Sequence, residues 1–343
     1  MGGGWQASLL HLVPALGGRG RAAQPAFRFL RQLLYSGMSI DVCVVLLCNL
    51  WLARRSGGAN ASGTDEIMQT LGVAIRNAAA VTTVSQAEGV AAAPVAAAAA
   101  MHKICEVAPR EGLAFVSVLV GLLRGGMEAS TQQRLGGAPG LCMAALALLV
   151  ESAELRPMPL LALLRTLLPG LSLTAPGLRD DVGAGLARCL ACVVDEYRPP
   201  VEPDAEEDQP APEPEQDQEP EPERGQESAA QREEYEAALA SVAALEEVVG
   251  LMWSAACSGT PGRPATRAAA FAALAQLVGA VGSDPECMEP LCTGTTAAAV
   301  LKAEVQDAAA ASAPTGGPKL GASQASLETC SDFVKAVLHL QGL

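Results

Sequence analysis

Apolar residues recur along the chain at the three- and four-residue spacing of an amphipathic helix, and Gly or Pro closes each stretch. The pattern predicts helices over residues 8–16, 24–35, 40–53, 65–80, 92–107, 111–123, 140–152, 157–168, 178–197, 234–256 and 265–281. Nowhere do Val, Ile, Thr and Tyr alternate with polar residues over five or more positions, which would indicate a strand. We therefore expect an all-α fold.

Neighbouring predicted helices are joined by short turns rich in Gly and Pro, and such pairs are the unit of α-solenoids. The clearest pair joins residues 234–256 to residues 265–281 through a turn at 258–264. Small residues such as Ala269, Ala272 and Ala273 on the second helix let two backbones approach closely. The pattern predicts a HEAT/armadillo-like α-solenoid, a right-handed superhelix of antiparallel helix pairs.

Two segments of low apolar content divide the chain. Residues 199–227 contain eight Pro and no Leu, Ile, Phe or Trp, so burial cannot offset the entropy lost on ordering them. Residues 308–323 consist largely of Ala, Ser, Gly and Pro. The expected organisation is a first solenoid part (1–198), a disordered acidic Pro/Glu-rich insertion (199–230), continued solenoid (231–307), a flexible linker (308–323) and a C-terminal helix (324–343).

Charge and composition narrow the function classes. The formal net charge is −14, and residues 201–227 alone carry −11 of it, with twelve acids and one base. The rest of the chain is nearly balanced and shows no broad basic face, so direct binding of nucleic acid is not expected. Half of the residues are hydrophobic but only 3% are aromatic, so the core is expected to consist mainly of Ala, Leu and Val.

No set of residues with the spacing of a catalytic or metal site is evident. We expect no cleavable secretory signal in this long chain, and we expect its ten Cys to be small buried hydrophobes. The CxxC motif of Cys189 and Cys192 lies inside an apolar helix and lacks a second ligand pair. No acid or thiol pattern connects any two of the three His, which are His11, His102 and His339. We therefore expect a non-enzymatic, cytoplasmic protein without cofactor or metal.

Several segments match a known family in order. Residues 8–18 (SLLHLVPALGG), 27–34 (FRFLRQLL) and 42–51 (VCVVLLCNLW) form consecutive predicted helices, the third ending on Trp51. Residues 103–112 (KICEVAPREG) and the Leu-rich helices to Leu171 follow, and residues 248–277 contain Trp253, a short polar turn and an Ala-rich helix. Over residues 8–281 this order resembles the focadhesin family, which includes animal focadhesin and the plant Resurrection protein.

The resemblance implies an armadillo-type, non-enzymatic scaffold in which Trp51 and Trp253 are structural anchors. Members of the family are associated with focal adhesions, with restraint of cell growth, and in plants with cuticular wax, embryo development and the bridging of the cytosolic RNA exosome to the Ski complex. They are much longer chains, so the resemblance implies a fragment or a shortened member.

Two functions remain open at this point. The first is an interaction scaffold for protein partners, with the Ski complex and the RNA exosome as the partners that the resemblance implies. The alternative is a peripheral membrane, focal-adhesion or trafficking adaptor, because bulky apolar residues adjoin Arg at residues 27–31 and 51–55.

Overall fold

The structure is a computed structural model. It describes residues 23–35, 39–56, 62–81, 92–128, 135–174, 178–196, 224–257, 263–281, 294–311 and 323–340. These residues form helices and no strand, which confirms the expected all-α class for the described part of the chain. The predicted helix 8–16 and residues 197–223 of the acidic insertion lie outside the described residues. The chain divides into two compact units, Met1–Cys189 and Leu190–Leu343.

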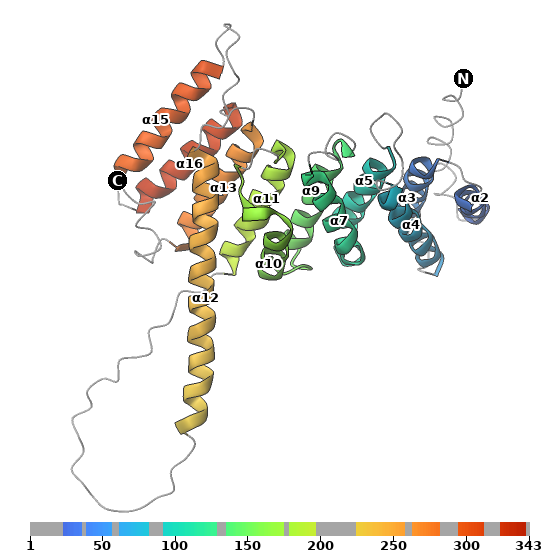
Figure 1. The fold of residues 1–343 in the computed structure, drawn as a ribbon, viewed down its shortest axis with the longest axis horizontal. Coiled ribbons are helices and arrows are strands. Elements are labelled where there is room, and N and C mark those ends of the chain that lie inside the picture. The colour runs from blue at the N-terminus through green and yellow to red at the C-terminus, as the bar shows by residue number, and fades with distance from the viewer. Residues whose placement is uncertain are drawn as a thin grey trace, which may run out of the picture. The chain divides into compact units, whose positions relative to one another are not determined.

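The first unit is a stack of helices (Figure 1). Its elements are α2 (Ala23–Tyr35), α3 (Ile40–Ser56), α4 (Ser62–Ala80), α5 (Ala92–Val107), α6 (Pro109–Gly112), the 3-10 turn η2 (Leu113–Phe115), α7 (Val116–Met127), α9 (Ala138–Glu151), α10 (Pro157–Leu167), the 3-10 turn η3 (Pro169–Leu171) and the first part of α11 (Asp180–Asp195). Most of these bounds lie within a few residues of the predicted ones.

The stack has two layers. In one layer α3 packs against α5, and α5 packs against α9; in the other, α4 packs against α7. Contacts of α3 with α4, of α4 with α5 and of α7 with α9 join the layers into packed helix pairs. The Ala-rich α5 lies between α3 and α9, and its Ala97 and Ala98 are fully buried. Small side chains suit this position because they let neighbouring backbones approach closely, as expected for an α-solenoid.

The predicted helix 111–123 is divided in the structure. Pro109 begins the short α6, η2 follows, and α7 starts only at Val116. A Cβ on Gly112 would lie 2.6 Å from Cys105 Sγ and 3.1 Å from Leu149 Cδ2, so the chain turns here by pressing Gly112 against α5 and α9.

Glycines also set the spacing between α9 and α11. The space that a Cβ on Gly140 would need is occupied by the Asp181 side chain, and a Cβ on Gly185 would lie 2.6 Å from Met143 Cγ. Arg188 of α11 donates two hydrogen bonds to Glu151 Oε1 of α9, at 2.7 and 3.0 Å. These glycines lie inside continuous helices because they permit close packing.

The second unit contains α12 (Arg224–Cys257), α13 (Pro264–Val281), α15 (Gly294–Ala311) and α16 (Gln324–Leu340). Helix α13 packs against α12 and α16, and α15 packs against α16. Phe333 lies at the centre of an aromatic group, 6.2 Å from the Phe271 ring centroid and 6.1 Å from that of Trp253. This group, together with Leu274, Leu277 and other aliphatic residues, forms the apolar core of the unit.

Helix α15 is attached mainly through charged groups. Its one buried residue among those whose side chains are described is Glu304, which is fully buried. Arg267 Nε of α13 donates to Glu304 Oε2 at 2.7 Å, and Arg267 Nη2 donates to Asp307 Oδ2 at 3.2 Å. Ser326 Oγ of α16 donates to Glu304 Oε1 at 2.5 Å. A hydrogen-bonded ion pair therefore links α15 to both neighbouring helices.

Two expected segment bounds differ from the structure. Helix α12 begins at Arg224, inside the expected disordered range 199–230, because the last Pro of the acidic stretch is Pro222 and helix-forming Gln, Glu and Ala follow. Helix α15 continues to Ala311, inside the expected linker 308–323, because its last four residues are Ala.

Candidate functional site

A groove of about 770 Å³ runs along α4 in the first unit. Its floor and walls come from the end of α3, one face of α4, and the α6–η2 turn. The lining residues are Trp51, Arg55, Thr64, Asp65, Met68, Gln69, Gly72, Val73, Arg76, Glu111, Ala114 and Phe115. Its volume falls within the usual range of ligand sites.

The α4 lining follows helical periodicity. Asp65, Met68, Gly72 and Arg76 are spaced three or four residues apart and therefore share one face of the helix. The opposite face carries Ile67 and Ala74, which are buried in the core of the unit. One side of α4 thus builds the core while the other remains open along its length.

The wall from α3 is held by stacked and paired side chains. Trp51 is 1% exposed, and the Arg55 guanidinium lies 5.4 Å from its ring centroid. Arg55 Nη1 also donates to Glu111 Oε1 at 2.6 Å. Both partners of this ion pair are more than a third exposed, so it contributes at most about 1 kcal/mol and mainly fixes the position of Arg55. Glu111 Oε2 is buried and has no hydrogen-bond partner among the described residues.

Opposite charges stand at the two ends of the α4 face. Asp65 lies in the first turn of α4, and Arg76 lies eleven residues later, about 16 Å along the helix axis. Both are exposed, and neither makes an ion pair within the described part of the chain. Between them lie half-buried Met68 and Val73, which is 44% exposed. The Arg76 guanidinium reaches back to Gly72, where its Nη1 atom would lie 3.8 Å from an added Cβ, so the groove offers an acidic end and a basic group near its middle.

Gly72 lies at the middle of this face and is buried. A Cβ built there would have as its nearest neighbours Arg76 Nη1 and the Phe115 ring, each at 3.8 Å, which is ordinary van der Waals contact. A methyl group at this position would therefore fit without strain, whereas a longer side chain would push against the Arg76 side chain and the Phe115 ring and extend into the groove.

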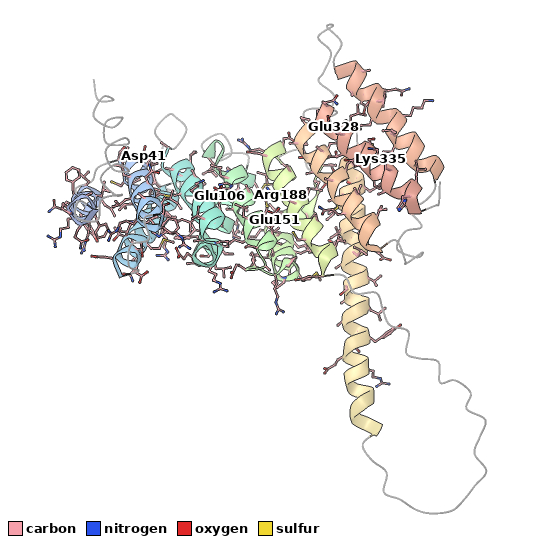
Figure 2. All side chains as sticks on the ribbon, turned by 180° about the vertical axis from the view of Figure 1, so that it is seen from behind. Asp41, Glu106, Glu151, Arg188, Glu328 and Lys335 are labelled. Atoms are coloured by element: carbon pink, nitrogen blue, oxygen red, sulfur yellow. The ribbon has the colours of Figure 1, made fainter. Side chains whose placement is uncertain are left out.

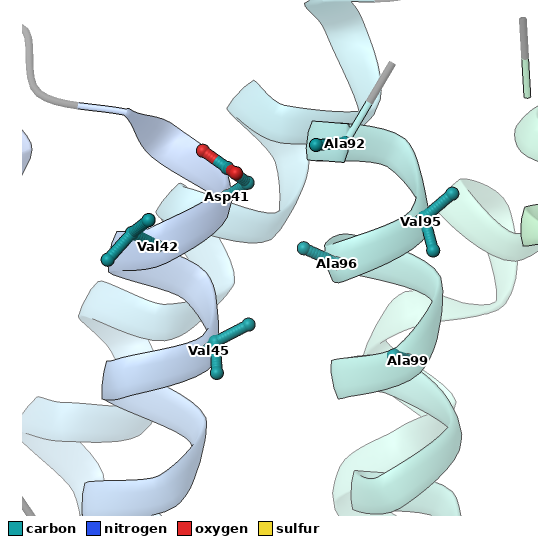
Figure 3. Close-up of a pocket in the computed structure, with 7 residues that line it drawn as sticks. All are labelled: Asp41, Val42, Val45, Ala92, Val95, Ala96 and Ala99. Atoms are coloured by element: carbon teal, nitrogen blue, oxygen red, sulfur yellow. The ribbon is translucent and has the colours of Figure 1, made fainter. Parts of the chain in front are cut away.

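A second hollow, of about 570 Å³, lies between α3 and α5 (Figure 3). Val45 of α3 and Ala96 of α5 point toward this space, and Asp41 is the one charged residue of its lining. The walls offer no hydrogen-bonding side chain besides Asp41, so this hollow has little to orient a ligand.

Polar side chains cross the ends of α5, α9 and α11. Lys103 Nζ donates to Glu106 Oε2 at 2.7 Å, and the pair of Glu151 and Arg188 can be followed in Figure 2. Burial lowers the pKa of His102; nearby Glu106 opposes this effect, and Lys103 and Arg188 reinforce it. His102 is therefore neutral at pH 7. The hydrogen bond and charge of Lys103 lower the pKa of the Glu106 carboxyl.

Burial holds several of the described thiols in the protonated form. Burial raises the pKa of Cys48 to about 11 and that of Cys105 to about 12, and it also raises the pKa of Cys142. The CxxC motif lies inside α11, with Cys189 buried and Cys192 half-buried. No group of three or more His, Cys, Asp or Glu that could hold a metal ion occurs among the described residues. His11, Cys287 and Cys292 lie outside them.

The two proposed anchors have different surroundings. Trp51 is buried beneath Arg55 and forms part of the groove wall. Trp253 is half-buried, and its ring meets Phe333 edge to face. The structure thus brings Trp51 to the candidate groove, whereas Trp253 belongs to the core of the second unit.

The segments that suggested membrane contact turn most of their apolar side chains inward. Phe27, Leu30 and Trp51 are at most 2% exposed, whereas Phe29 is 47% exposed. Among the described helices, the segment Tyr235–Cys257 of α12 is long and apolar enough to cross a membrane by length and composition alone. Core helices of soluble proteins pass the same test, and Leu245 of this segment is buried within the second unit.

Sequence reasoning did not single out the groove. Its α4 residues mix both charges with apolar side chains, so no single motif marks them, and Glu111 and Phe115 join them only through the fold. The signal that could have found it was the spacing of Asp65, Met68, Gly72 and Arg76, which places two opposite charges on one helix face.

The chain matches no model of a protein family, no curated protein and no solved structure.

Proposed function

We propose that this chain is a non-enzymatic scaffold that binds protein partners on a HEAT- or armadillo-like stack of helix pairs. The observation that supports this function is the groove along α4, whose lining combines apolar side chains with the exposed charges of Asp65 and Arg76. Such a lining suits a protein surface, because an apolar contact excludes water while the charges fix orientation.

The surroundings of the groove also suit a binding role. Arg55 and Trp51 are held in place by stacking and by the ion pair with Glu111, so one wall is formed before a partner arrives. A rigid wall reduces the ordering entropy that binding would otherwise cost. Burial raises the pKa of thiols such as Cys48 and Cys105, which disfavours the thiolate that nucleophilic catalysis would need.

The family resemblance suggests where the partners are found. If the chain acts as focadhesin-like proteins do, its partners are cytosolic complexes such as the Ski complex and the RNA exosome. A role at focal adhesions or at the cytoplasmic surface of a membrane is the alternative. The proposal places the chain in the cytoplasm in both cases.

The test is affinity purification of the intact chain from cells that express it. The natural chain is compared with a variant in which a larger side chain fills the groove. Gly72→Leu fills the groove, and Gly121→Leu on α7 is the matched control, because Gly121 is exposed and a Cβ added there would have no atom within 4 Å. We expect discrete protein partners with the natural chain and with Gly121→Leu, and their loss with Gly72→Leu. Recovery of no stable protein partner by the natural chain would overturn the proposal.

A further inference from the structure

We infer that the surface of α13 and α16 beneath α15 is a second binding site of this chain, for an acidic amphipathic helix of a partner protein, and that α15 is the intramolecular ligand of this site. The site lies within the second unit. It adds to the groove of the first unit and does not depend on it.

Helix α15 is held with little apolar burial. It lies at the edge of the second unit, along α16 (Figure 1). Among its described side chains Glu304 alone is buried, Val300 and Leu301 are half-buried, and Val305 is 48% exposed. Elements with few buried apolar contacts open at a lower free energy than the rest of a fold. We therefore expect α15 to leave α13 and α16 more readily than these two helices leave each other.

The surface beneath α15 is suited to hold a carboxylate. The Arg267 side chain of α13 is only 6% exposed, and Ser326 of α16 is fully buried. Arg267 Nε donates to Glu304 Oε2 at 2.7 Å, and Ser326 Oγ donates to Glu304 Oε1 at 2.5 Å. Two donors on different helices thus meet the two oxygens of one acid. Hydrogen bonds to a charged group are stronger than neutral ones, so this pair of donors favours an acidic ligand.

The site is not saturated by α15. Arg267 Nη1 is buried and has no hydrogen-bond partner among the described residues. The other nitrogens of the guanidinium are used, since Nε donates to Glu304 and Nη2 donates to Asp307 at 3.2 Å. A buried donor without an acceptor costs free energy. A ligand whose carboxylate also accepts from Nη1 removes this cost, and it can therefore compete with α15 for the site.

Helix α15 shows which residues such a ligand presents. Glu304 and Asp307 both meet Arg267 and are three residues apart, so they share one face of α15. Half-buried Val300 and Leu301 precede Glu304 by about one turn on the same side. The matching partner helix has a pair of apolar residues followed one and two turns later by acids. Because α15 competes from within the same chain at a high effective concentration, the site is open to a partner only when α15 is released.

The test adds the α15 sequence as a separate molecule. The probe is a fluorescent peptide of residues 294–311, and its binding to the full chain is measured by fluorescence anisotropy. A peptide with Glu304→Gln and Asp307→Asn is the control for charge. In the full chain Glu304→Ala weakens the attachment of α15, and Glu328→Ala is the matched control because Glu328 is exposed on α16.

We expect the probe to bind Glu304→Ala at least ~10-fold more tightly than it binds the natural chain or Glu328→Ala, because α15 then no longer fills the site. The control peptide should bind Glu304→Ala at least ~10-fold more weakly than the probe does, because it lacks the charges that Arg267 pairs with.

A charge reversal tests the contact itself. In Arg267→Glu the natural α15 is repelled, and a peptide with Glu304→Lys and Asp307→Lys should bind this variant better than the probe does. Such an exchange of preference is specific to direct contact, since a folding defect would weaken both peptides.

Equal binding of the probe to the natural chain and to Glu304→Ala, or an unchanged charge preference in Arg267→Glu, would overturn the inference. So would a dimer of the natural chain in analytical ultracentrifugation that Glu304→Ala dissociates, because the surface would then take α15 of a second copy. Gly72→Leu in the first unit should leave binding of the probe unchanged. A failed peptide test therefore refutes this site alone and leaves the proposed scaffold function to its own test.

Discussion

Helix α15 should depend on Glu304 for its attachment to the second unit. Glu304 is fully buried, and the Arg267 side chain that pairs with it is only 6% exposed. Glu304→Ala removes both carboxylate oxygens, so Arg267 loses its nearest partner and Ser326 Oγ loses one acceptor. What remains for Arg267 is the bond to Asp307 at 3.2 Å, and the Asp307 side chain is 29% exposed.

The size of the effect follows from this inventory. Removing one partner of a buried ion pair typically costs about 3–5 kcal/mol. Because Asp307 still neutralises part of the Arg267 charge, we expect the lower end, about 3 kcal/mol. That free energy corresponds to a roughly 150-fold increase in the opening equilibrium of α15.

Hydrogen exchange with mass spectrometry measures this opening directly. Amides of α15 should exchange roughly 150-fold faster in Glu304→Ala than in the natural chain. Glu328→Ala is the control, since Glu328 lies exposed on α16 and surface substitutions usually change stability by less than about 0.5 kcal/mol (Figure 2). Replacing both partners, Arg267→Met with Glu304→Leu, should restore most of the protection, because no unpaired charge is then buried.

Two results would refute this reasoning. If Glu304→Ala left exchange of α15 within fivefold of the natural chain, the ion pair would not be what holds the helix. If the double replacement were as damaging as the single one, the loss would come from packing around the site rather than from an uncompensated charge.

Three further outcomes follow from the first unit. Trp51→Ala should cost about 3–5 kcal/mol in urea unfolding, because it empties a buried aromatic site, and a loss below about 1 kcal/mol would contradict that packing. On α7, Gly126→Ala should destabilise the fold by about 1–3 kcal/mol, because its Cβ would overlap the Pro139 ring. Gly121→Ala on the same helix should be neutral or stabilising by up to about 1 kcal/mol, because no atom lies near its Cβ position. Thermal melts in which Gly126→Ala is the more stable of the two would refute this. Burial raises the pKa of Cys105 from 9.0 to about 12, so above pH 9 the folded state keeps a proton that the unfolded chain loses. The contribution of this thiol to the free energy of unfolding is therefore complete below pH 9 and is lost as pH rises toward 12. The midpoint urea concentration of unfolding should therefore decrease as the pH is raised from 8.5 to 10.5, and it should decrease less in Cys105→Ala. A midpoint that did not decrease would contradict this direction of the pH dependence.

The apolar periodicity was enough to predict most helices of the first unit. The predicted range 92–107 coincides with α5, and 157–168 differs from α10 by one residue. In these helices the buried stripe is apolar, so the sequence pattern and the packing carry the same information.

Helix α15 was not predicted because its burial does not follow an apolar stripe. Glu304 is its one buried residue among the described side chains, and its partner Arg267 lies 37 residues earlier. Acids in one Ala-rich stretch and a base in another carry no local signal, because the contact between them is made only by the fold.

The groove was inaccessible to sequence reasoning for a similar reason. Trp51 was singled out as a packing anchor, yet its role as a wall depends on Arg55 and Glu111, which come from different elements. Gly72 has no distinguishing pattern in the sequence, and only the fold shows that it lies in the groove beside Arg76 and Phe115.

The most direct test of the account is covalent capture at the groove. A photo-crosslinking residue replaces Val73, which is 44% exposed beside Gly72, and Val305 on α15, 48% exposed, is the control position. After irradiation of the full chain in extract of cells that express it, we expect one or a few discrete protein adducts at position 73 that Gly72→Leu abolishes and that position 305 does not form. No adduct at position 73, or adducts that persist with Gly72→Leu, would contradict a protein-binding groove along α4.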